Sequence, residues 1–405
     1  MPSDSSAMLK VMLGKADISQ QVVRVDIEDV DRGADKATFV MDDPGATNSD
    51  GIEENMDVRI ELGWESEYAL AFVGRVRSVR SLANSGGKHR VEATCLDLSS
   101  RFMKPPPIEG RQHVGPLDKI LADIAKDTGV PVGAVTVDPM PTWTEDKPLD
   151  QLNRTAWQMI QDIAEEYHAR AFVEVNAAPK DSEAVKAAGG EPKLYFASLQ
   201  SLLDQAPMGE LSYCRGMGSL LDYQLTRMGS GASPVASAAV ANPDDAAAVD
   251  SFDLPPTAPD VQPAPSASKI DRTAAVRGEA AAADYAAARQ NAADAEALPA
   301  EQRAQRHVAG TPSDAPLVKR LIQQDQTRKL GYRLVGTAMG TVFLRAKGSV
   351  TIDGLPSMTT GRWYVSRVNH IVERGTLIER EDVDARARAA RQKRLTFRSK
   401  LVATR

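Results

Sequence analysis

The 405-residue sequence predicts an α+β protein that is mainly β, with two antiparallel β-barrels, an α+β domain and a long Ala/Pro-rich insertion. Three observations support this fold class. Near both ends of the chain, apolar and polar residues alternate with a period of two, as in strands with one buried face. Between these regions, apolar residues recur at helical spacing. A stretch rich in alanine, proline and serine then interrupts the second β region.

The first barrel is expected over residues 1–104. Its expected strands are residues 23–28, 57–62, 71–80 and 90–96. The last two flank Asn84-Ser-Gly-Gly87, whose two glycines supply the positive φ angles of a tight hairpin turn. Lys104-Pro-Pro-Pro107 ends the sheet, because proline has no backbone N–H to donate to a neighbouring strand.

Residues 105–210 form the predicted α+β domain. Its first helix begins at Leu117 and ends at Thr128-Gly129. A second helix begins near Thr155, because Thr155 and Gln158 have the spacing of a capping box. We interpret its apolar stripe as core and not as a cofactor site; the stripe contains Trp157, Ile160, Ile163, Ala164 and Tyr167. Two strands are expected next, at residues 171–175 and 193–196.

The second barrel is predicted in two parts, residues 211–228 and residues 316–384. The second part opens with an amphipathic helix at 317–330 and continues as β structure from Tyr332. Residues 229–315 form the insertion between the two parts. Its first portion, 229–268, has too few large apolar side chains to form a core and is predicted to be a linker, and the Ala-rich portion 270–306 predicts an exposed helix.

The two β regions contain similar segments. Asn55–Gly63 precedes the strand pattern Phe72–Val79, and Lys347–Leu355 precedes the pattern Trp363–His370. Each segment has a polar turn, a short alternating strand, a loop and a longer strand with valines three residues apart. This similarity indicates two related β units in one chain, although two unrelated amphipathic β stretches would also give a match this short.

Charge is unevenly distributed along the chain, whose formal net charge is -6. Residues 1–70 contain 16 acidic and 6 basic side chains, whereas residues 385–405 contain eight basic side chains and no acidic one. We predict a basic C-terminal tail over 385–405, which either docks on an acidic partner or is a solvated chain end. The weakly acidic total argues against a general nucleic-acid binder.

Cysteine content and hydropathy limit the class of protein further. Cys95 and Cys214 are too few for a disulfide framework or a zinc site and are typical of a reducing compartment. The first residues lack the basic and apolar parts of a signal peptide. No apolar run reaches the roughly 18 residues of a membrane helix. A secreted disulfide-rich protein and a membrane-anchored protein are therefore not expected.

Known catalytic patterns are not matched, so no catalytic, cofactor-binding or metal-ligating residue is singled out. The five histidines, at 89, 113, 168, 307 and 370, lack metal-ligand spacing, and His168 beside Glu165 and Glu166 is interpreted as a solvated helix end. Gly216-Met-Gly218 is not a dinucleotide loop, because Leu221 replaces the third glycine, and no glycine follows Ser219 at the spacing of a hydrolase nucleophile. Carboxylate pairs for glycoside hydrolysis are set by space, and nothing in the sequence selects one.

Several segments, in this order, carry a resemblance to a known family. They are Phe72-Val-Gly-Arg-Val76, Cys95–Phe102, Leu117–Gly129, Gln151–Trp157, Glu165-Glu-Tyr167, Leu194-Tyr-Phe196, Leu344–Leu355 and Gly361–His370. Together they resemble the phage late-control D proteins, the baseplate hub proteins of contractile tails, which are related to the N-terminal part of type VI secretion spike proteins. The resemblance covers about residues 8–228 and 315–384, and it rests on the order of the segments.

The resemblance implies two tail-tube-like barrels related by duplication. Three chains would form a ring with pseudo-sixfold symmetry on one face and threefold symmetry on the other. Such a homotrimer would join a hexameric tail tube to a trimeric spike and leave a central channel. The implied partners are the tail-tube ring, the trimeric spike, baseplate wedge or LysM-type hub proteins and, in the lumen, the tape-measure protein. No specific nucleic-acid binding, membrane anchor or cofactor is expected.

The resulting hypothesis is a non-enzymatic structural protein of the virion, assembled in the cytoplasm of the bacterial host. Two alternatives stay open. The chain could be the hub of a bacterial contractile injection or type VI-like particle, which the neighbouring genes would distinguish. It could instead be a tail-associated peptidoglycan hydrolase, which clearing of peptidoglycan by the purified chain would reveal. A two-domain β adhesin agrees poorly with the internal helices. The insertion at 229–306 and the basic tail are departures from the family pattern.

Overall fold

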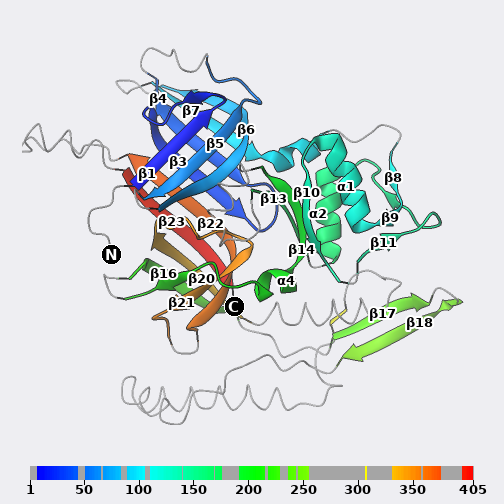
Figure 1. Cartoon of the computed structure of the whole chain (residues 1–405). Coiled ribbons are helices and arrows are strands. Elements are labelled where there is room, and N and C mark those ends of the chain that lie inside the picture. Colours follow the sequence, from blue (N-terminus) through cyan, green and yellow to red (C-terminus); the bar gives the residue numbers. More distant parts are fainter. Residues whose placement is uncertain are drawn as a thin grey trace, which may run out of the picture. The chain divides into compact units, whose positions relative to one another are not determined.

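The structure is a computed structural model that describes residues 7–43, 51–64, 67–83, 89–104, 110–138, 140–167, 169–175, 191–214, 218–228, 236–242, 245–254, 306–307, 331–356, 359–374 and 395–404 (Figure 1). The chain divides into two units. The first comprises Met1–Leu225 with Arg333–Arg405, and the second comprises Thr226–Tyr332.

A 13-stranded curled sheet dominates the first unit, which confirms the mainly β, α+β fold class. Its strands are β1 Ala7–Leu13, β2 Ala16–Asp17, β3 Val22–Val30, β4 Lys36–Asp42, β5 Asp57–Trp64, β6 Glu67–Leu82, β7 Arg90–Asp97, β15 Glu210–Ser212, β16 Leu220–Met228, β20 Gly331–Met339, β21 Gly348–Asp353, β22 Gly361–Arg374 and β23 Leu395–Thr404. Among the described strands the order is β16-β20-β23-β22-β3-β4-β7-β6-β5-β1-β2, with β21 and β15 continuing from β22.

Two halves of this sheet have the same topology. The first half has the order β1-β5-β6-β7-β4-β3, and the second has β15-β21-β22-β23-β20-β16. Numbered by their position along the chain, both halves read 1-4-5-6-3-2. They differ at their first strand, because β1 is antiparallel to β5 whereas the short β15 is parallel to β21. The two predicted barrels therefore appear as halves of one continuous sheet, joined where β22 pairs with β3.

The two similar sequence segments occupy equivalent places in these halves. Asn55 and Lys347, which precede β5 and β21, have φ angles of 69° and 65°, a left-handed conformation that is rare for residues other than glycine. Their backbone N–H groups donate to the carbonyls of Val76 in β6 and Val365 in β22, at 2.8 and 3.0 Å. A bulge follows each valine in the pairing with the next strand. The sequence similarity thus reflects a repeated backbone conformation.

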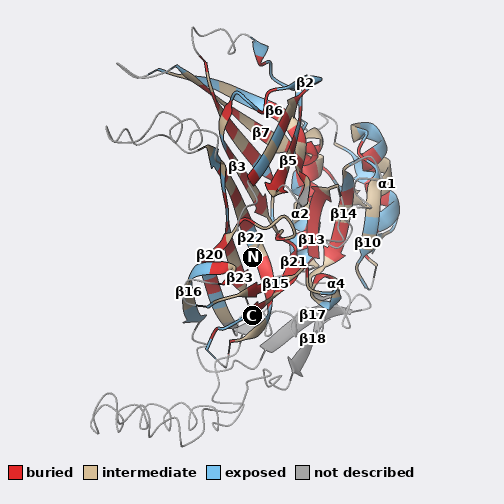
Figure 2. Cartoon of the chain, turned by 60° about the vertical axis from the view of Figure 1, so that its left-hand side comes forward, coloured by how far each residue is buried: buried red, intermediate tan, exposed pale blue. Residues whose placement is uncertain are grey.

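The sheet is built by the alternation that the sequence shows. In β4, in β7 and in β3 from Val25 onward, every second side chain is buried, and Figure 2 shows the resulting alternation of buried and more exposed residues along the strands. The core of the first half is made mainly of β-branched and aromatic residues, among them Val25, Ile27, Phe39, Ile60 and Val91. The predicted hairpin is confirmed by the antiparallel pairing of β6 with β7, while Asn84–Gly87 lies outside the described residues.

The α+β domain contains the predicted helices and strands. A 3-10 helix at Leu98–Met103 leads from β7 to α1 Leu117–Thr128, which ends at Gly129 with a φ of 67°. Helix α2 spans Ala156–Glu166, and its predicted capping box between Thr155 and Gln158 is present. The remaining elements are β8 Gln112–His113, β9 Gly115–Pro116, β10 Val132–Thr136, β11 Thr142–Trp143, β12 Leu149–Asp150, β13 Ala169–Glu174, β14 Lys193–Ser198 and α4 Leu199–Asp204. Their core includes the predicted stripe of α2.

The predicted basic tail is wrong for residues 395–404. Strand β23 (Leu395–Thr404) lies between β20 and β22 and pairs with both, so the second half of the sheet does not end at residue 384. Phe397, Ser399, Leu401 and Ala403 are buried, while Arg398 and Lys400 are exposed. The high density of basic residues concealed this period of two. Residues 375–394 lie outside the described part of the chain.

The predicted linker also contains strands. In the second unit, β17 Ala236–Asn242 pairs antiparallel with β18 Asp245–Leu254 and parallel with β19 Arg306–His307. Backbone hydrogen bonds can pair strands whose side chains are small, so a scarcity of large apolar residues was not sufficient to exclude them. The helices predicted at 270–306 and 317–330 lie, apart from Arg306, outside the described residues, as does Pro105–Pro107.

Candidate functional site

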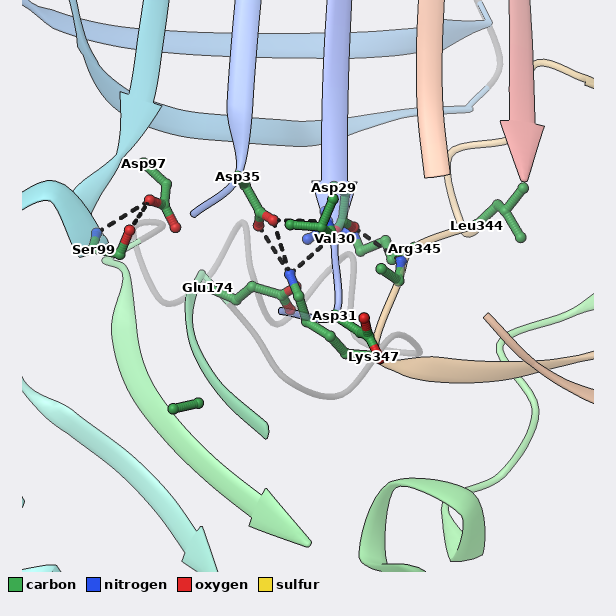
Figure 3. Close-up of polar contacts among 12 residues, drawn as sticks. Asp29, Val30, Asp31, Asp35, Asp97, Ser99, Glu174, Leu344, Arg345 and Lys347 are labelled. Atoms are coloured by element: carbon green, nitrogen blue, oxygen red, sulfur yellow. Dashed lines mark hydrogen bonds and ion pairs between the residues drawn. The ribbon is translucent and has the colours of Figure 1, made fainter. Parts of the chain in front are cut away.

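A buried cluster of charged side chains lies where three parts of the first unit meet (Figure 3). The ammonium Nζ of Lys347 lies 2.7 Å from Asp29 Oδ1, 2.9 Å from Asp35 Oδ2 and 2.7 Å from Glu174 Oε1. The Lys347 side chain is 2% exposed, so these ion pairs are almost completely shielded from water. Nζ also lies 5.3 Å from the centre of the Phe172 ring. We call these five residues the Lys347 cluster.

Each charged member of the cluster is placed by the end of a strand. Asp29 is near the end of β3, Asp35 immediately precedes β4, and Glu174 is the last residue of β13. Lys347 immediately precedes β21 and has the left-handed backbone conformation described above. The cluster therefore connects the first half of the sheet, the α+β domain and the second half of the sheet.

Backbone hydrogen bonds fix two of the carboxylates. Asp29 Oδ2 accepts from the N–H of Ala346 at 3.0 Å, and Asp35 Oδ1 accepts from the N–H of Val30 at 3.0 Å. A second buried ion pair lies close by, between Arg170 Nε in β13 and Asp31 Oδ2 at 2.9 Å. The hydroxyl of Tyr364 in β22 donates to the same Asp31 oxygen at 3.4 Å. All three parts are thus joined by directional polar contacts.

Burial and the shared lysine set the protonation of the cluster. Burial raises the pKa of Asp35 well above its usual range, although the charge of Lys347 opposes this rise. The negative charges of Asp29, Asp97 and Glu174 raise it further. Burial likewise raises the pKa of Glu174 and raises that of Asp97, whose carboxylate accepts from Ser99, to about 7. Burial alone would raise the pKa of Asp29, but the charge and hydrogen bond of Lys347 lower it. Burial opposes the charge on Lys347, yet the three carboxylates raise its pKa.

The three carboxylates are also arranged as a cation site would require, because their oxygens lie within 4.8 Å of one another. Lys347 Nζ already lies within 3 Å of each carboxylate and takes the position of the cation. The chain thereby supplies its own positive charge. Buried ions that are paired and hydrogen-bonded fix geometry more than they add stability, so the arrangement is suited to holding domains in register.

The fold is similar to that of a tail protein from Neisseria meningitidis, with a TM-score of 0.58 at 13% identity, covering 99% of this chain and 97% of that one. It is also similar to the 43 kDa tail protein of prophage MuSo2 from Shewanella oneidensis, with a TM-score of 0.57 at 9% identity, covering 99% and 98% of the two chains. The chain has the fold of these two tail proteins. The sequence matches no family model and no curated protein.

Two further solved structures share this fold, a chain of a PdpA–VgrG complex and a component of a type VI secretion system. A Francisella PdpA–VgrG complex contains a chain that matches 99% of this one at a TM-score of 0.54 and 9% identity, and this chain covers 53% of it. An Escherichia coli component of the type VI secretion system matches at a TM-score of 0.52 and 8% identity, covering 98% of this chain and 76% of that one. In the part of the chain that the structure describes, no helix is long and apolar enough to cross a membrane.

The described histidines, serine and cysteine that the sequence offers as candidates lie in different parts of the fold. His113 and His370 are buried and hydrogen-bonded, to Gln151 and to Ser399 with Leu344 respectively. Ser219 accepts from the backbone N–H of Ser212 at 2.9 Å. His168, Gly216 and Met217 lie outside the described residues, and Glu165 pairs with Arg32 at 3.2 Å. Burial raises the pKa of the Cys95 thiol to about 12, which makes it unreactive.

Sequence reasoning missed the Lys347 cluster. Its charged members are separated by up to 318 positions along the chain, so no local spacing identifies them. One signal was present, because Lys347 opens the segment that resembles Asn55–Gly63, at the position of Asn55. A lysine in place of the turn-forming asparagine is unusual at a left-handed position.

His370 gives a prediction about pH dependence. Its Nε2 lies 2.9 Å from the carbonyl of Leu344, which can only accept, so Nε2 carries the proton and Nδ1 accepts from Ser399. Burial lowers the pKa of His370 to about 4 from 6.5, so the unfolded chain binds more protons between these values. His370→Gln is therefore expected to flatten the loss of stability between pH 6.5 and 4 by up to about 1.4 kcal/mol per pH unit.

The measurement is the free energy of unfolding by denaturant at several pH values, for the natural chain and the variant. His89, which is not in the buried core, provides the control as His89→Gln. Equal pH slopes for the natural chain and His370→Gln would show that the His370 proton is not excluded by the fold.

Proposed function

We propose that the chain is the structural, non-enzymatic hub of a contractile phage tail, and that it works as a homotrimer. In this role it joins the hexameric tail-tube ring to the trimeric spike and leaves a central channel. The observation that carries the proposal is the repeated 1-4-5-6-3-2 topology within one curled sheet, together with the tail-protein fold. Because each chain has two equivalent β units, a trimer contains six such units. The six units match the six subunits of the tail-tube ring, and the three chains match the three chains of the spike.

The Lys347 cluster supports a mechanical role. A hub that transmits force must hold its β units and its α+β domain in fixed register. Lys347 pairs with a carboxylate from β3, one preceding β4 and one from β13, and the Arg170–Asp31 pair adds a further link. Such multi-point ion pairing in a shielded site resists sliding, because any displacement would leave a buried charge without its partner.

The proposed partners are the tail-tube protein, the trimeric central spike, baseplate wedge or LysM-type hub proteins, and the tape-measure protein in the lumen. The proposed location is the baseplate of the virion, after assembly in the bacterial host cytoplasm. A second candidate is the hub of a bacterial contractile injection or type VI-like particle. The similarity to the PdpA–VgrG complex and to the type VI secretion component favours this candidate enough to test it.

The test is the native mass of the purified chain, alone and mixed with the spike protein encoded beside it. The proposal expects three times the chain mass of 43.6 kDa for the hub, and one hub trimer for each spike trimer in the complex. A chain that stays monomeric and never binds a trimeric spike would overturn the proposal. Neighbouring capsid and terminase genes would favour the phage, and neighbouring toxin genes the injection particle.

A further inference from the structure

The sheet contains one joint between β units that can be followed residue by residue. Arg367–Glu373 of β22 pairs antiparallel with Arg24–Val30 of β3, with His370 opposite Ile27 and Ile371 opposite Asp26. In the repeated topology, β6 is the counterpart of β22, and β16 is the counterpart of β3. The repeat therefore contains a second set of the same two edges, on β6 and on β16.

The edge on β6 is unpaired in the described part of the chain. On one edge, β6 pairs with β5 over Glu67–Arg75 only. On the opposite edge it pairs with β7 from Gly74 to Leu82. Val76 corresponds to Val365, so Val79 and Ser81 correspond to Val368 and His370. Val368 and His370 are buried beside β3, whereas Val79 is half-buried and Ser81 is exposed.

The edge on β16 is unpaired in the same sense, because β16 is the terminal strand of the described sheet order. Two equivalent backbone hydrogen bonds show which residues of β16 correspond to which residues of β3. The N–H of Asp42 donates to the carbonyl of Gln21, and the N–H of Met339 donates to the carbonyl of Ser219. Leu220, Tyr223 and Leu225 then take the places of Val22, Val25 and Ile27. Val25 and Ile27 are buried, whereas Tyr223 and Leu225 are only half-buried and Leu221 is 48% exposed.

We infer that the exposed part of β6 in one chain pairs antiparallel with β16 of a second copy of the chain. The joint inside the chain then sets the register: Ser81 lies opposite Leu225, and Leu82 lies opposite Gln224. The occupant is a second copy because β16 has the same place in the topology as β3, the strand that fits this edge, and its corresponding positions are less buried than those of β3. An open strand edge of this length is otherwise a site for uncontrolled association.

This inference rests on the proposed trimer and adds its contacts. The joint is head-to-tail, since β6 of one chain meets β16 of the next. Around the assembly, second halves and first halves of the sheet alternate. Three chains therefore close a ring of six β units. Every inter-unit joint in that ring has the same strand pairing, whether inside a chain or between chains.

Paired cysteines test the register directly. In a Cys214→Ser background, which removes the exposed cysteine and leaves the buried Cys95, one variant carries Ser81→Cys with Leu225→Cys and the other Leu82→Cys with Gln224→Cys. Opposite residues in an antiparallel pair alternate between wider and closer Cα separations, so at least one variant has the geometry for a disulfide. We expect mild oxidation to give covalent dimers and trimers, at least tenfold more than each single-cysteine variant gives.

The control pairs Ser81→Cys with Leu221→Cys, which lies on the same strand but four residues out of register. Native mass is measured on the same samples under reducing conditions, so that assembly and register are read separately. Trimers in which neither matched pair cross-links, or in which the control cross-links equally well, would overturn the strand pairing and leave the trimer standing. A chain that is monomeric throughout would overturn both the pairing and the proposed hub.

Discussion

Replacing Lys347 by methionine is expected to lower the free energy of unfolding by about 3–5 kcal/mol, because it leaves buried carboxylates without their positive partner. Lys347 is the common partner of Asp29, Asp35 and Glu174, at distances of 2.7 to 2.9 Å. Methionine has a similar length, so the change removes the charge with little change in volume. The loss should shrink at acid pH, because the raised pKa values of Asp35 and Glu174 allow those groups to become neutral there.

The measurement is denaturant unfolding of Lys347→Met beside a surface control. Lys126→Met serves as that control, since Lys126 pairs with Asp123 at 3.2 Å on an exposed helix face and its loss should cost about 1 kcal/mol or less. Adding Glu174→Gln to Lys347→Met should recover part of the loss, because it removes one of the uncompensated charges. A cost for Lys347→Met no larger than that of the control would show that the cluster does not hold the fold together.

Replacing Phe397 by alanine is expected to cost about 3–5 kcal/mol, as for other large buried aromatic side chains. Phe397 is 4% exposed, and its ring centre lies 5.9 Å from that of Trp64 and 5.8 Å from that of His370. Trp64 belongs to β5 in the first half of the sheet, whereas Phe397 belongs to β23 in the second. The substitution therefore removes packing between the two halves.

The neighbouring residue supplies a matched control. Arg398 is exposed, so Arg398→Ala is expected to change the free energy of unfolding by no more than about 0.5 kcal/mol. Thermal and denaturant unfolding of both variants compare the two sides of one strand. If both changes were neutral, residues 395–404 would behave as the solvated basic tail that the sequence predicts and not as a strand.

Local patterns predicted much of the fold. The Thr155–Gln158 capping box, the left-handed Gly129 that ends α1, and the alternation in β3 and β5 all depend on neighbours in the sequence, and all are present. Strand β23 was missed because its outward-facing residues are basic and lie in a basic stretch, which made the alternation of Phe397, Ser399 and Leu401 less evident. Its partners β20 and β22 identify it only in three dimensions.

The candidate site could not be predicted in the same way. Lys347 contacts Asp29 and Glu174 only through the tertiary structure, because β3, β13 and the start of β21 are far apart along the chain. A sequence with many aspartates and glutamates does not indicate which three will surround one lysine. The repeated segment at Asn55 and Lys347 marked the right place on the chain, but its charge partners come from tertiary structure.

End-on cryo-electron microscopy of the purified assembly tests the central claim most directly. We expect a closed ring with six similar β lobes built from three chains, with adjacent lobes joined by the same strand pairing throughout. Six-lobed rings containing three copies of the 43.6 kDa chain would match this prediction. Three-lobed rings, rings of six chains, or lobes of different chains joined through surfaces other than β6 and β16 would contradict it.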